Sequence, residues 1–168
     1  MITQKRLKEM LHYDPDTGVF TWLVNLPNGT KVGDIAGCNN FRYNLIGVDK
    51  KQYLIHRLAF LYMIGEIPKY VDHINEIKDD NRWCNLRPCN QSQNMANVVA
   101  PLSNNKSGFK GVYWEKYRCK WRADIKKNGK NHLVGRFDSP EAAHKAYKQK
   151  HVEIFGEFSP YFKQEGSP

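Results

Sequence analysis

The segment "VDHINEIKDDNRWCNLRPCNQSQNMAN", residues 71–97, decides the fold that we expect for the first half of the chain. Two short runs typical of strands, "KYVDHI" and "LRP", flank a long polar loop at residues 75–85. We interpret "NQSQNMANVV", which follows them, as a helix. This order of elements predicts a β-loop-β-α unit.

The residues before this unit predict a small antiparallel sheet and two helices. Leu7, Met10 and Leu11 follow helical spacing within residues 3–11, and "VFTW", "YNLIGV" and "QYLI" indicate strands. "HRLAFLYMIG", residues 56–65, is typical of a buried helix that Gly65 ends, with Pro68 shortly after it.

The last third of the chain predicts a different arrangement. "GVYWEKY", "KWRADIKKNGK" and "HLVGRF" indicate three strands, and the Asn-Gly pair within residues 127–130 supplies the positive φ angles of a hairpin turn. A helix follows, with Ser139 as N-cap, Pro140 at its first position and Gly156 at its end.

These signals together predict an α+β fold. We expect an N-terminal antiparallel sheet with the β-loop-β-α unit, followed by a small three-stranded antiparallel sheet packed on one helix. "APLSNNKSG" has the composition of a linker. We therefore predict a first domain at residues 1–99, a linker at 100–107 and a second domain at 108–168.

Composition limits the class of protein. A hydrophobic fraction of 40% and a charged fraction of 26% fit a soluble globular chain. The sequence contains no run of about eighteen apolar residues, and its start lacks the apolar stretch of a secretory signal. Four irregularly spaced cysteines indicate reduced thiols. We therefore expect a cytoplasmic protein without a membrane segment.

The positive charge is concentrated in one segment. Of the 26 basic and 17 acidic residues, 13 basic and 4 acidic ones lie within residues 106–150, which leaves 13 of each elsewhere. Lysines that served solubility alone would be spread more evenly. The excess therefore predicts a polyanionic partner, and we favour nucleic acid.

The polar segment at residues 71–97 has the groups that phosphodiester hydrolysis needs. A histidine removes a proton from water near neutral pH, and a divalent cation stabilises charge on the phosphate. Adjacent strand residues point to opposite faces, so Asp72 and His73 reach one phosphate only at a strand end or twist. Asn90, Asn94 and Asn97 have helical spacing, which predicts a face of amides aimed at the preceding strands.

"VDHIN", "NRWCNLR" and "SQNMAN" resemble the HNH (His-Me finger, ββα-metal) nucleases, especially the phage homing-endonuclease branch with Asn at the last position. The likeness extends over residues 53–97. It implies that His73 is the general base, that Asn85 braces the loop and orients His73, and that Asp72 and Asn94 bind the metal. We expect Mg²⁺, or Mn²⁺ in its place, because oxygen ligands suit these ions.

Simpler interpretations of the same residues remain open. A polar hairpin also places a histidine and amides where they satisfy loop backbone groups. Cys84 and Cys89 lack the second cysteine pair of a zinc site, so we expect no zinc. His56 begins an apolar helix and is interpreted as a capping or core residue. Arg87 is a candidate phosphate contact, although a solvent-facing role is equally consistent with the sequence.

Residues 107–158 resemble the plant ethylene-response-factor (APETALA-type) DNA-binding domain. The matching marks are "KGV", "WRADI", "GRF" and the helix residues "EAA" and "AY". In that family the sheet lies in the major groove of DNA. The resemblance and the charge pattern imply a set of DNA contacts: Lys110, Tyr113, Lys120, Arg122, Lys126 and Arg136, with Glu115 also considered.

The departures from that family are informative. Lys110 stands where the family has a guanine-reading arginine, Tyr113 replaces a second arginine, and Leu133 replaces a tryptophan. Lysine makes a point contact rather than a bidentate one. The target sequence of the plant proteins is therefore not expected here.

Our first hypothesis is a two-domain, site-directed DNA endonuclease of a mobile, phage-borne element. We expect double-stranded DNA as partner, a monomeric chain and no small-molecule cofactor. The alternative hypothesis is a non-catalytic DNA-binding regulator or a decayed nuclease, and a third is an RNA-binding protein. Strand cleavage with Mg²⁺ separates the first hypothesis from the others.

Overall fold

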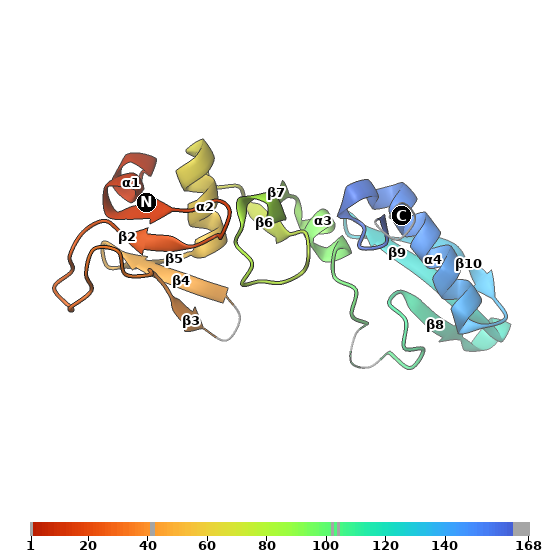
Figure 1. Ribbon diagram of the computed structural model, residues 1–168. Helices are drawn as coiled ribbons and strands as arrows, with labels where there is room; N and C mark the ends of the chain where they lie inside the picture. Colours follow the sequence, from red (N-terminus) through yellow and green to blue (C-terminus); the bar gives the residue numbers. More distant parts are fainter. Residues whose placement is uncertain (1, 41–42, 102, 104, 163–168) are drawn as a thin grey trace. The chain divides into compact units, whose positions relative to one another are not determined.

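The computed structural model describes residues 2–40, 43–101, 103 and 105–162. The chain forms two compact units, Met1–Cys89 and Asn90–Pro168. Each unit mixes helices with small antiparallel sheets, so the predicted α+β class is confirmed (Figure 1). The predicted domain boundaries at residues 99 and 108 stay predictions, because a division into compact units does not show which stretches fold independently.

Among its described residues, the first unit contains two α-helices, one short 3₁₀ helix and three small sheets. Its elements ahead of the polar segment are α1 (Gln4–Met10), β1 (Leu11–Tyr13), β2 (Phe20–Trp22), β3 (Cys38–Asn40), β4 (Tyr43–Val48), β5 (Lys51–Leu54) and α2 (Ile55–Ile64). β1 pairs with β2, and β4 lies between β3 and β5, with all pairs antiparallel. Thr3 caps α1, and Gly65 ends α2 in the left-handed conformation that glycine adopts without strain.

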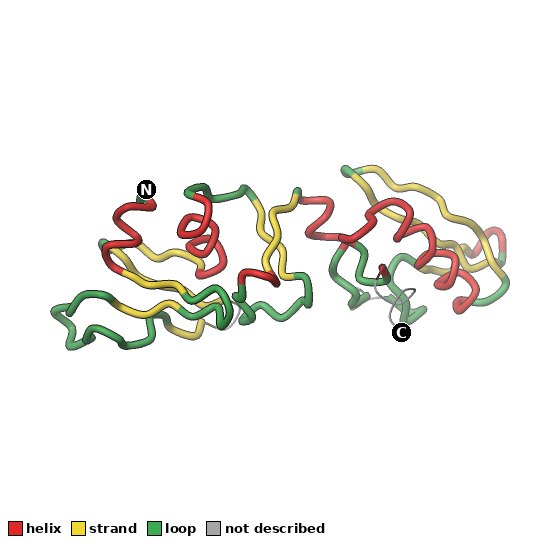
Figure 2. The backbone as a smooth tube through the Cα atoms, turned by 45° about the horizontal axis from the view of Figure 1, so that its top comes forward, coloured by secondary structure: helices red, strands yellow, loops and turns green. Residues whose placement is uncertain are grey.

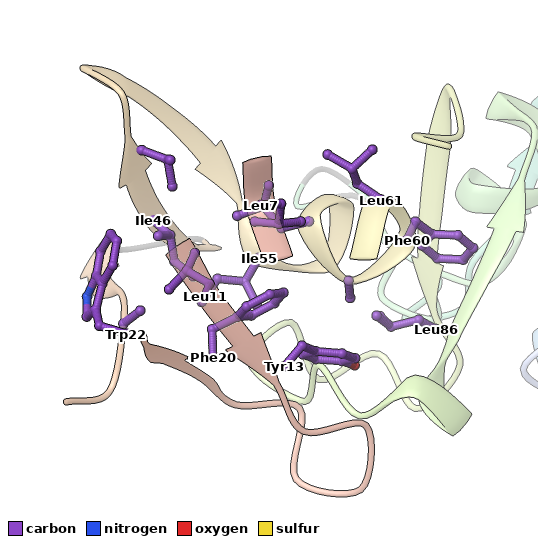
Figure 3. Packing of buried hydrophobic residues seen from close by; sticks show 14 residues of the cluster. Leu7, Leu11, Tyr13, Phe20, Trp22, Ile46, Ile55, Phe60, Leu61 and Leu86 are labelled. Atoms are coloured by element: carbon purple, nitrogen blue, oxygen red, sulfur yellow. The ribbon is translucent and has the colours of Figure 1, made fainter. Parts of the chain in front are cut away.

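One apolar core holds this unit together. Leu11 and Phe20 from the β1–β2 hairpin meet Ile55 from α2, and all three are buried (Figure 3). The core continues to Leu86, which belongs to the polar segment, and Phe60 of α2 packs on Trp83 of the same segment with ring centroids 4.8 Å apart. The polar segment is therefore anchored to α2 by apolar contacts.

The polar segment forms the predicted hairpin. β6 (Tyr70–His73) pairs antiparallel with β7 (Leu86–Cys89), and the loop between them ends in the short 3₁₀ helix η1 (Trp83–Asn85). The register places Asp72 opposite Arg87 and His73 opposite Leu86.

The second unit contains the predicted three-stranded sheet and its helix. The elements are α3 (Gln91–Ala96), β8 (Val112–Glu115), η2 (Lys116–Arg118), β9 (Lys120–Lys127), β10 (Lys130–Phe137), α4 (Pro140–Phe155) and η3 (Gly156–Phe158). β9 is the central strand, and both of its neighbours are antiparallel to it. Figure 2 shows α4 in red running along this sheet. The hairpin turn has positive φ at Asn128 and Gly129, as the sequence predicts.

The helix packs on the sheet through small and aromatic side chains. Val112, Ala123 and Ile125 of the sheet are buried with Ala143 and Tyr147 of α4. Gly111 has φ 73°, and a Cβ at this position would lie 2.3 Å from the Tyr147 ring, so only glycine fits. Within the described residues, no helix has the length and apolar character needed to cross a bilayer.

Candidate active site

Asp72 and His73 are the last two residues of strand β6. Each is only 5% exposed, which is unusual for these residue types. Position at a strand end is the condition under which the two neighbours can serve one phosphate. Because burial of polar groups is costly, each of these side chains needs partners nearby.

Asp72 is held by an arginine from the neighbouring strand. The Nε and Nη2 atoms of Arg87 donate to Oδ2 of Asp72 at 2.9 and 2.8 Å. The two side chains are 12% and 6% exposed, so the ion pair is nearly buried. The sequence predicted Arg87 as a DNA contact. It did not predict that Arg87 pairs with Asp72, the proposed metal ligand. A role of Arg87 toward DNA stays a prediction.

His73 contacts an amide in the loop between β6 and β7. Its Nε2 atom lies 3.3 Å from Oδ1 of Asn81, a residue that is also buried. Burial lowers the pKa of His73, although Asn81 and Asp72 partly oppose that effect. The imidazole is therefore neutral at pH 7, as a general base must be.

His56 of α2 lies beside His73 rather than at the surface. The two rings meet edge to face with centroids 5.2 Å apart. Burial lowers the pKa of His56 to about 4, and the neighbouring His73 contributes to the same shift. His56 is therefore a buried, neutral residue whose ring packs against His73, which agrees with its interpretation as a core residue.

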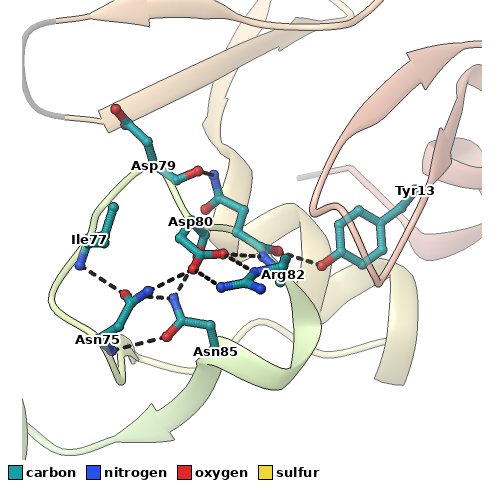
Figure 4. Close-up of polar contacts among 8 residues, drawn as sticks. Tyr13, Asn75, Ile77, Asp79, Asp80, Arg82 and Asn85 are labelled. Atoms are coloured by element: carbon teal, nitrogen blue, oxygen red, sulfur yellow. Dashed lines mark hydrogen bonds and ion pairs between the residues drawn. The ribbon is translucent and has the colours of Figure 1, made fainter.

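Asn85 closes the loop between the two strands (Figure 4). Its Oδ1 accepts from the Asn75 backbone N–H at 3.0 Å, and its Nδ2 donates to the Asp80 carbonyl at 2.7 Å and to Asn75 Oδ1 at 3.0 Å. These contacts are what a loop brace requires. The side-chain amide that lies 3.3 Å from His73 belongs to Asn81. The catalytic role of Asn85 stays a prediction.

Asp80 and Arg82 stabilise the same loop from its outer side. Arg82 donates to the two Asp80 oxygens at 2.7 and 2.6 Å. The Arg82 hydrogen bonds lower the pKa of Asp80 to about 2, so this carboxylate is ionised throughout the neutral range. Sequence reasoning missed Asn75, Asp80 and Asn81. Their residue types indicate a turn, and nothing in their order shows which of them faces His73.

The helix after β7 belongs to the second unit. Asn94 lies inside α3, and its pairing with Asp72 at a metal stays a prediction. The expected amide face needs one correction, because Asn90 precedes the helix and caps it. Asn90 Oδ1 accepts from the Gln93 N–H at 2.9 Å, and Gln93 completes a capping box. Asparagine favours this position because its side chain satisfies an unpaired N–H at the helix start.

The predicted metal ligands, Asp72 and Asn94, carry oxygen donors of the kind that a hard divalent cation binds. No group of three or more His, Cys, Asp or Glu side chains is arranged for a metal in the part of the chain that the structure describes. A carboxylate from Asp72 and an amide oxygen from Asn94 are nevertheless the ligand types that Mg²⁺ takes when phosphate and water complete its shell. A carboxylate has about four lone-pair sites, so Arg87 does not exhaust Asp72 as a ligand.

Three arginines surround Glu115 on the sheet of the second unit, and we call them the arginine cluster: Arg118, Arg122 and Arg136. Their nitrogens lie 3.8, 3.5 and 3.2 Å from the Glu115 oxygens. The Arg136 hydrogen bond is the largest cause of a lowered pKa at Glu115. The cluster offers planar cationic groups on one side of the sheet, held at their guanidinium ends by a carboxylate.

Tyr113 and Asp124 extend the cluster across the sheet. Arg122 Nε donates to Asp124 Oδ1 at 3.0 Å, and the Tyr113 hydroxyl donates to the other Asp124 oxygen. Burial and that hydrogen bond raise the pKa of Tyr113 to about 12. The structure thus brings together three of the predicted DNA contacts: Tyr113, Arg122 and Arg136.

The predicted lysine contacts are not part of the arginine cluster, although Lys120 lies opposite Glu115 in the register of β8 and β9. Lys110 precedes β8, and its ammonium donates to the carbonyls of Met95 and Ala96 at 3.1 and 3.2 Å, where it caps α3. Lys120 pairs with Asp138, and Lys126 is exposed on β9. All three stay predictions as DNA contacts.

Comparison with known proteins identifies relatives of the hairpin segment. A family model described as HNH endonuclease matches residues 53–96, which coincides with the stretch whose resemblance is described above. An uncharacterized HNH endonuclease, L560, of Acanthamoeba polyphaga mimivirus is 32% identical over 117 residues, which are 68% of this chain and 59% of that protein. Protein 3.8 of Escherichia phage T7 is 34% identical over 99 residues, which are 58% of this chain and 80% of that protein. No solved structure matches.

Proposed function

Because this chain belongs to the HNH endonuclease family, we propose that it hydrolyses phosphodiester bonds of double-stranded DNA, with His73 as general base and a divalent cation at Asp72 and Asn94. The observation that carries the proposal is the position of His73, which is buried and next to Asp72 at the end of β6.

The reaction needs one proton acceptor on the protein. His73 takes a proton from water, and the water oxygen forms a bond to phosphorus while the bond from phosphorus to the sugar oxygen breaks. The departing oxygen takes a proton from solvent. A bound Mg²⁺ or Mn²⁺ supplies positive charge that stabilises the phosphate and the departing oxygen.

The surrounding residues keep the base in place. Asn85 braces the loop, Arg87 holds the Asp72 carboxylate, and the core under Leu86 attaches the hairpin to α2. A base that the fold already holds in place loses little entropy when the substrate arrives.

The second unit positions the nuclease on DNA in this proposal. Support comes from the concentration of positive charge in residues 106–150, from the arginine cluster, and from the resemblance of this segment to the ethylene-response-factor domains. Two linked binding units raise the effective concentration of the nuclease at its site. We further propose that the chain acts as a monomer in the cytoplasm of a bacterial host.

The test is cleavage of supercoiled plasmid DNA by the full chain with Mg²⁺. We expect nicked or linear product, loss of cleavage with EDTA, and binding without cleavage by His73→Ala. His12→Ala is the matched control, since it removes an exposed histidine from the same unit. Cleavage by His73→Ala at the wild-type rate would disprove the mechanism.

The same assay addresses the alternative function. Salt-sensitive DNA binding without strand breakage in any divalent metal would support a regulator or decayed nuclease. Tighter binding to single-stranded RNA than to duplex DNA would instead support the RNA-binding hypothesis.

A further inference from the structure

We infer that the β1–β2 hairpin, residues 11–22, fixes the orientation and tautomer of His73 through Asn81. This hairpin lies outside residues 53–96, which match the family model. The catalytic consequence rests on the proposed function, whereas the orientation of His73 can be tested without it.

The contacts of Asn81 define which atom faces His73. Asn81 Nδ2 donates to the Asp79 carbonyl at 3.2 Å, and because a carbonyl oxygen can only accept, the side-chain atom that faces it is the amide nitrogen. Oδ1 is therefore the atom 3.3 Å from His73 Nε2. Because an amide oxygen only accepts, Nε2 must carry the hydrogen. The neutral ring then has its lone pair on Nδ1, which becomes the nitrogen that takes a proton from water.

The hairpin also contacts the Asn81 backbone, and Figure 4 shows Tyr13 pointing toward the loop that carries Asp79, Asp80 and Arg82. The hydroxyl of Tyr13, in β1, donates to the Asn81 carbonyl at 2.6 Å, and this hydrogen bond is buried. Next to it, the Trp83 N–H donates to the Pro15 carbonyl at 2.9 Å. The two bonds bracket residues 81–83, and both come from residues more than sixty positions earlier in the chain.

Gly18 allows the hairpin to come this close. It adopts φ 74°, and a Cβ on it would lie 2.4 Å from the Asn81 carbonyl carbon and 2.5 Å from the Arg82 nitrogen. The Gly18 N–H also donates to the Asp14 carbonyl at 2.8 Å, which closes the turn between β1 and β2. A side chain would force the turn away from the loop, so the contact requires glycine on both steric and conformational grounds.

The hairpin is rigid enough to act as a support. Tyr13 packs on Phe20 with ring centroids 4.6 Å apart, and both side chains are almost completely buried. The loop thus has a fixed core on one side and His73 on the other. Asn81 is a positioning residue, because it acts on DNA only through His73.

The first experiment compares Asn81→Leu with Asn81→Asp in the full chain. Leucine is similar in size and has no acceptor, whereas aspartate keeps an oxygen that accepts from Nε2–H. Two-dimensional ¹⁵N NMR of the histidine rings reports the tautomer of His73. We expect Nε2–H in the wild type and in Asn81→Asp, and a mixture of tautomers in Asn81→Leu.

Single-turnover cleavage and DNA affinity supply the second readout. For Asn81→Leu we expect a cleavage rate reduced on the order of 100-fold on the rate plateau, as for a misplaced catalytic group. The DNA dissociation constant should change less than about twofold, because Asn81 is buried, and Asn81→Asp should recover most of the rate.

Tyr13→Phe tests the hairpin itself. This variant keeps the packed ring and removes the bond to the Asn81 carbonyl, so we expect a severalfold loss of rate and a partial change of tautomer. Tyr53→Phe removes a hydroxyl elsewhere in the same unit and serves as the control.

The outcomes separate the two levels of the inference. An unchanged Nε2–H tautomer in a folded Asn81→Leu protein would overturn the assignment of Asn81. An altered tautomer with reduced cleavage supports the whole inference. An altered tautomer in a protein whose wild type cuts no DNA supports the positioning of His73 and refutes the proposed function.

Discussion

The candidate active site and the arginine cluster differ in how deeply their polar groups are buried. Asp72 and His73 are each 5% exposed, whereas the side chains of the arginine cluster are 28% to 65% exposed. A buried group that loses its partner keeps the full cost of desolvation, while an exposed one regains water. The first region therefore depends on specific hydrogen bonds, and the second can exchange its partners when a phosphate arrives.

This difference predicts where substitutions will act. Changes in the buried site should lower stability and cleavage together unless they keep every hydrogen bond. Changes in the arginine cluster should leave stability nearly intact and alter the affinity for DNA and its dependence on salt.

Removal of one partner of the Asp72–Arg87 ion pair should have the largest effect on stability. Arg87→Leu leaves a buried carboxylate without its guanidinium, and we expect a loss of about 3–5 kcal/mol in the free energy of unfolding. The double variant Asp72→Asn/Arg87→Leu should recover much of that stability and still fail to cut DNA. Urea denaturation measures the first quantity, and equal stability of wild type and Arg87→Leu would contradict the prediction.

Acid should weaken both units, because each contains a buried histidine with a strongly lowered pKa. Burial lowers the pKa to about 4 at His56 and at His151, below the value near 6.5 in an unfolded chain. The unfolded state therefore binds more protons in this interval, and stability falls as the pH drops from about 6.5 to about 4. The loss should be on the order of 3 kcal/mol for each histidine.

Variants assign the acid effect to its unit. His56→Gln should reduce the pH dependence of unfolding in the first unit, and His151→Gln should do so in the second. Calorimetry at pH 7 and pH 5 measures both. A wild-type protein that is equally stable at pH 7 and pH 5 would argue against neutral buried histidines.

The arginine cluster should affect binding more than folding. For Arg122→Gln/Arg136→Gln we expect DNA affinity to fall on the order of tenfold and the salt slope to decrease by about two. Fluorescence anisotropy at several salt concentrations measures both. A salt slope that stays at the wild-type value would remove these arginines from the DNA interface.

The exposed pair of Lys120 and Asp138 should matter least. Asp138 is 90% exposed at its side chain, so Asp138→Asn should change stability by less than about 1 kcal/mol. The released ammonium should raise DNA affinity slightly at low salt. Thermal unfolding and anisotropy in parallel test the two parts, and a stability change comparable to that of Arg87→Leu would erase the contrast between the regions.

Short-range signals made much of the fold predictable. The Asn128–Gly129 turn, the Ser139 cap and the end of α2 at Gly65 depend on conformations that a few neighbouring residues specify. The ordered polar motif likewise identified the hairpin that carries Asp72 and His73. Asn90 was placed in a helix face because spacing alone does not separate a cap from a first helical residue.

The partners of the site were decided by tertiary structure. Arg87 faces Asp72 because the register of β6 and β7 places them opposite each other. Asn81 faces His73 because the β1–β2 hairpin packs on its loop through Tyr13 and Gly18. Local sequence encodes turns, caps and periodicity, which are properties of adjacent residues. Contacts between distant residues depend on how strands pair and loops pack, and these became visible only in the folded chain.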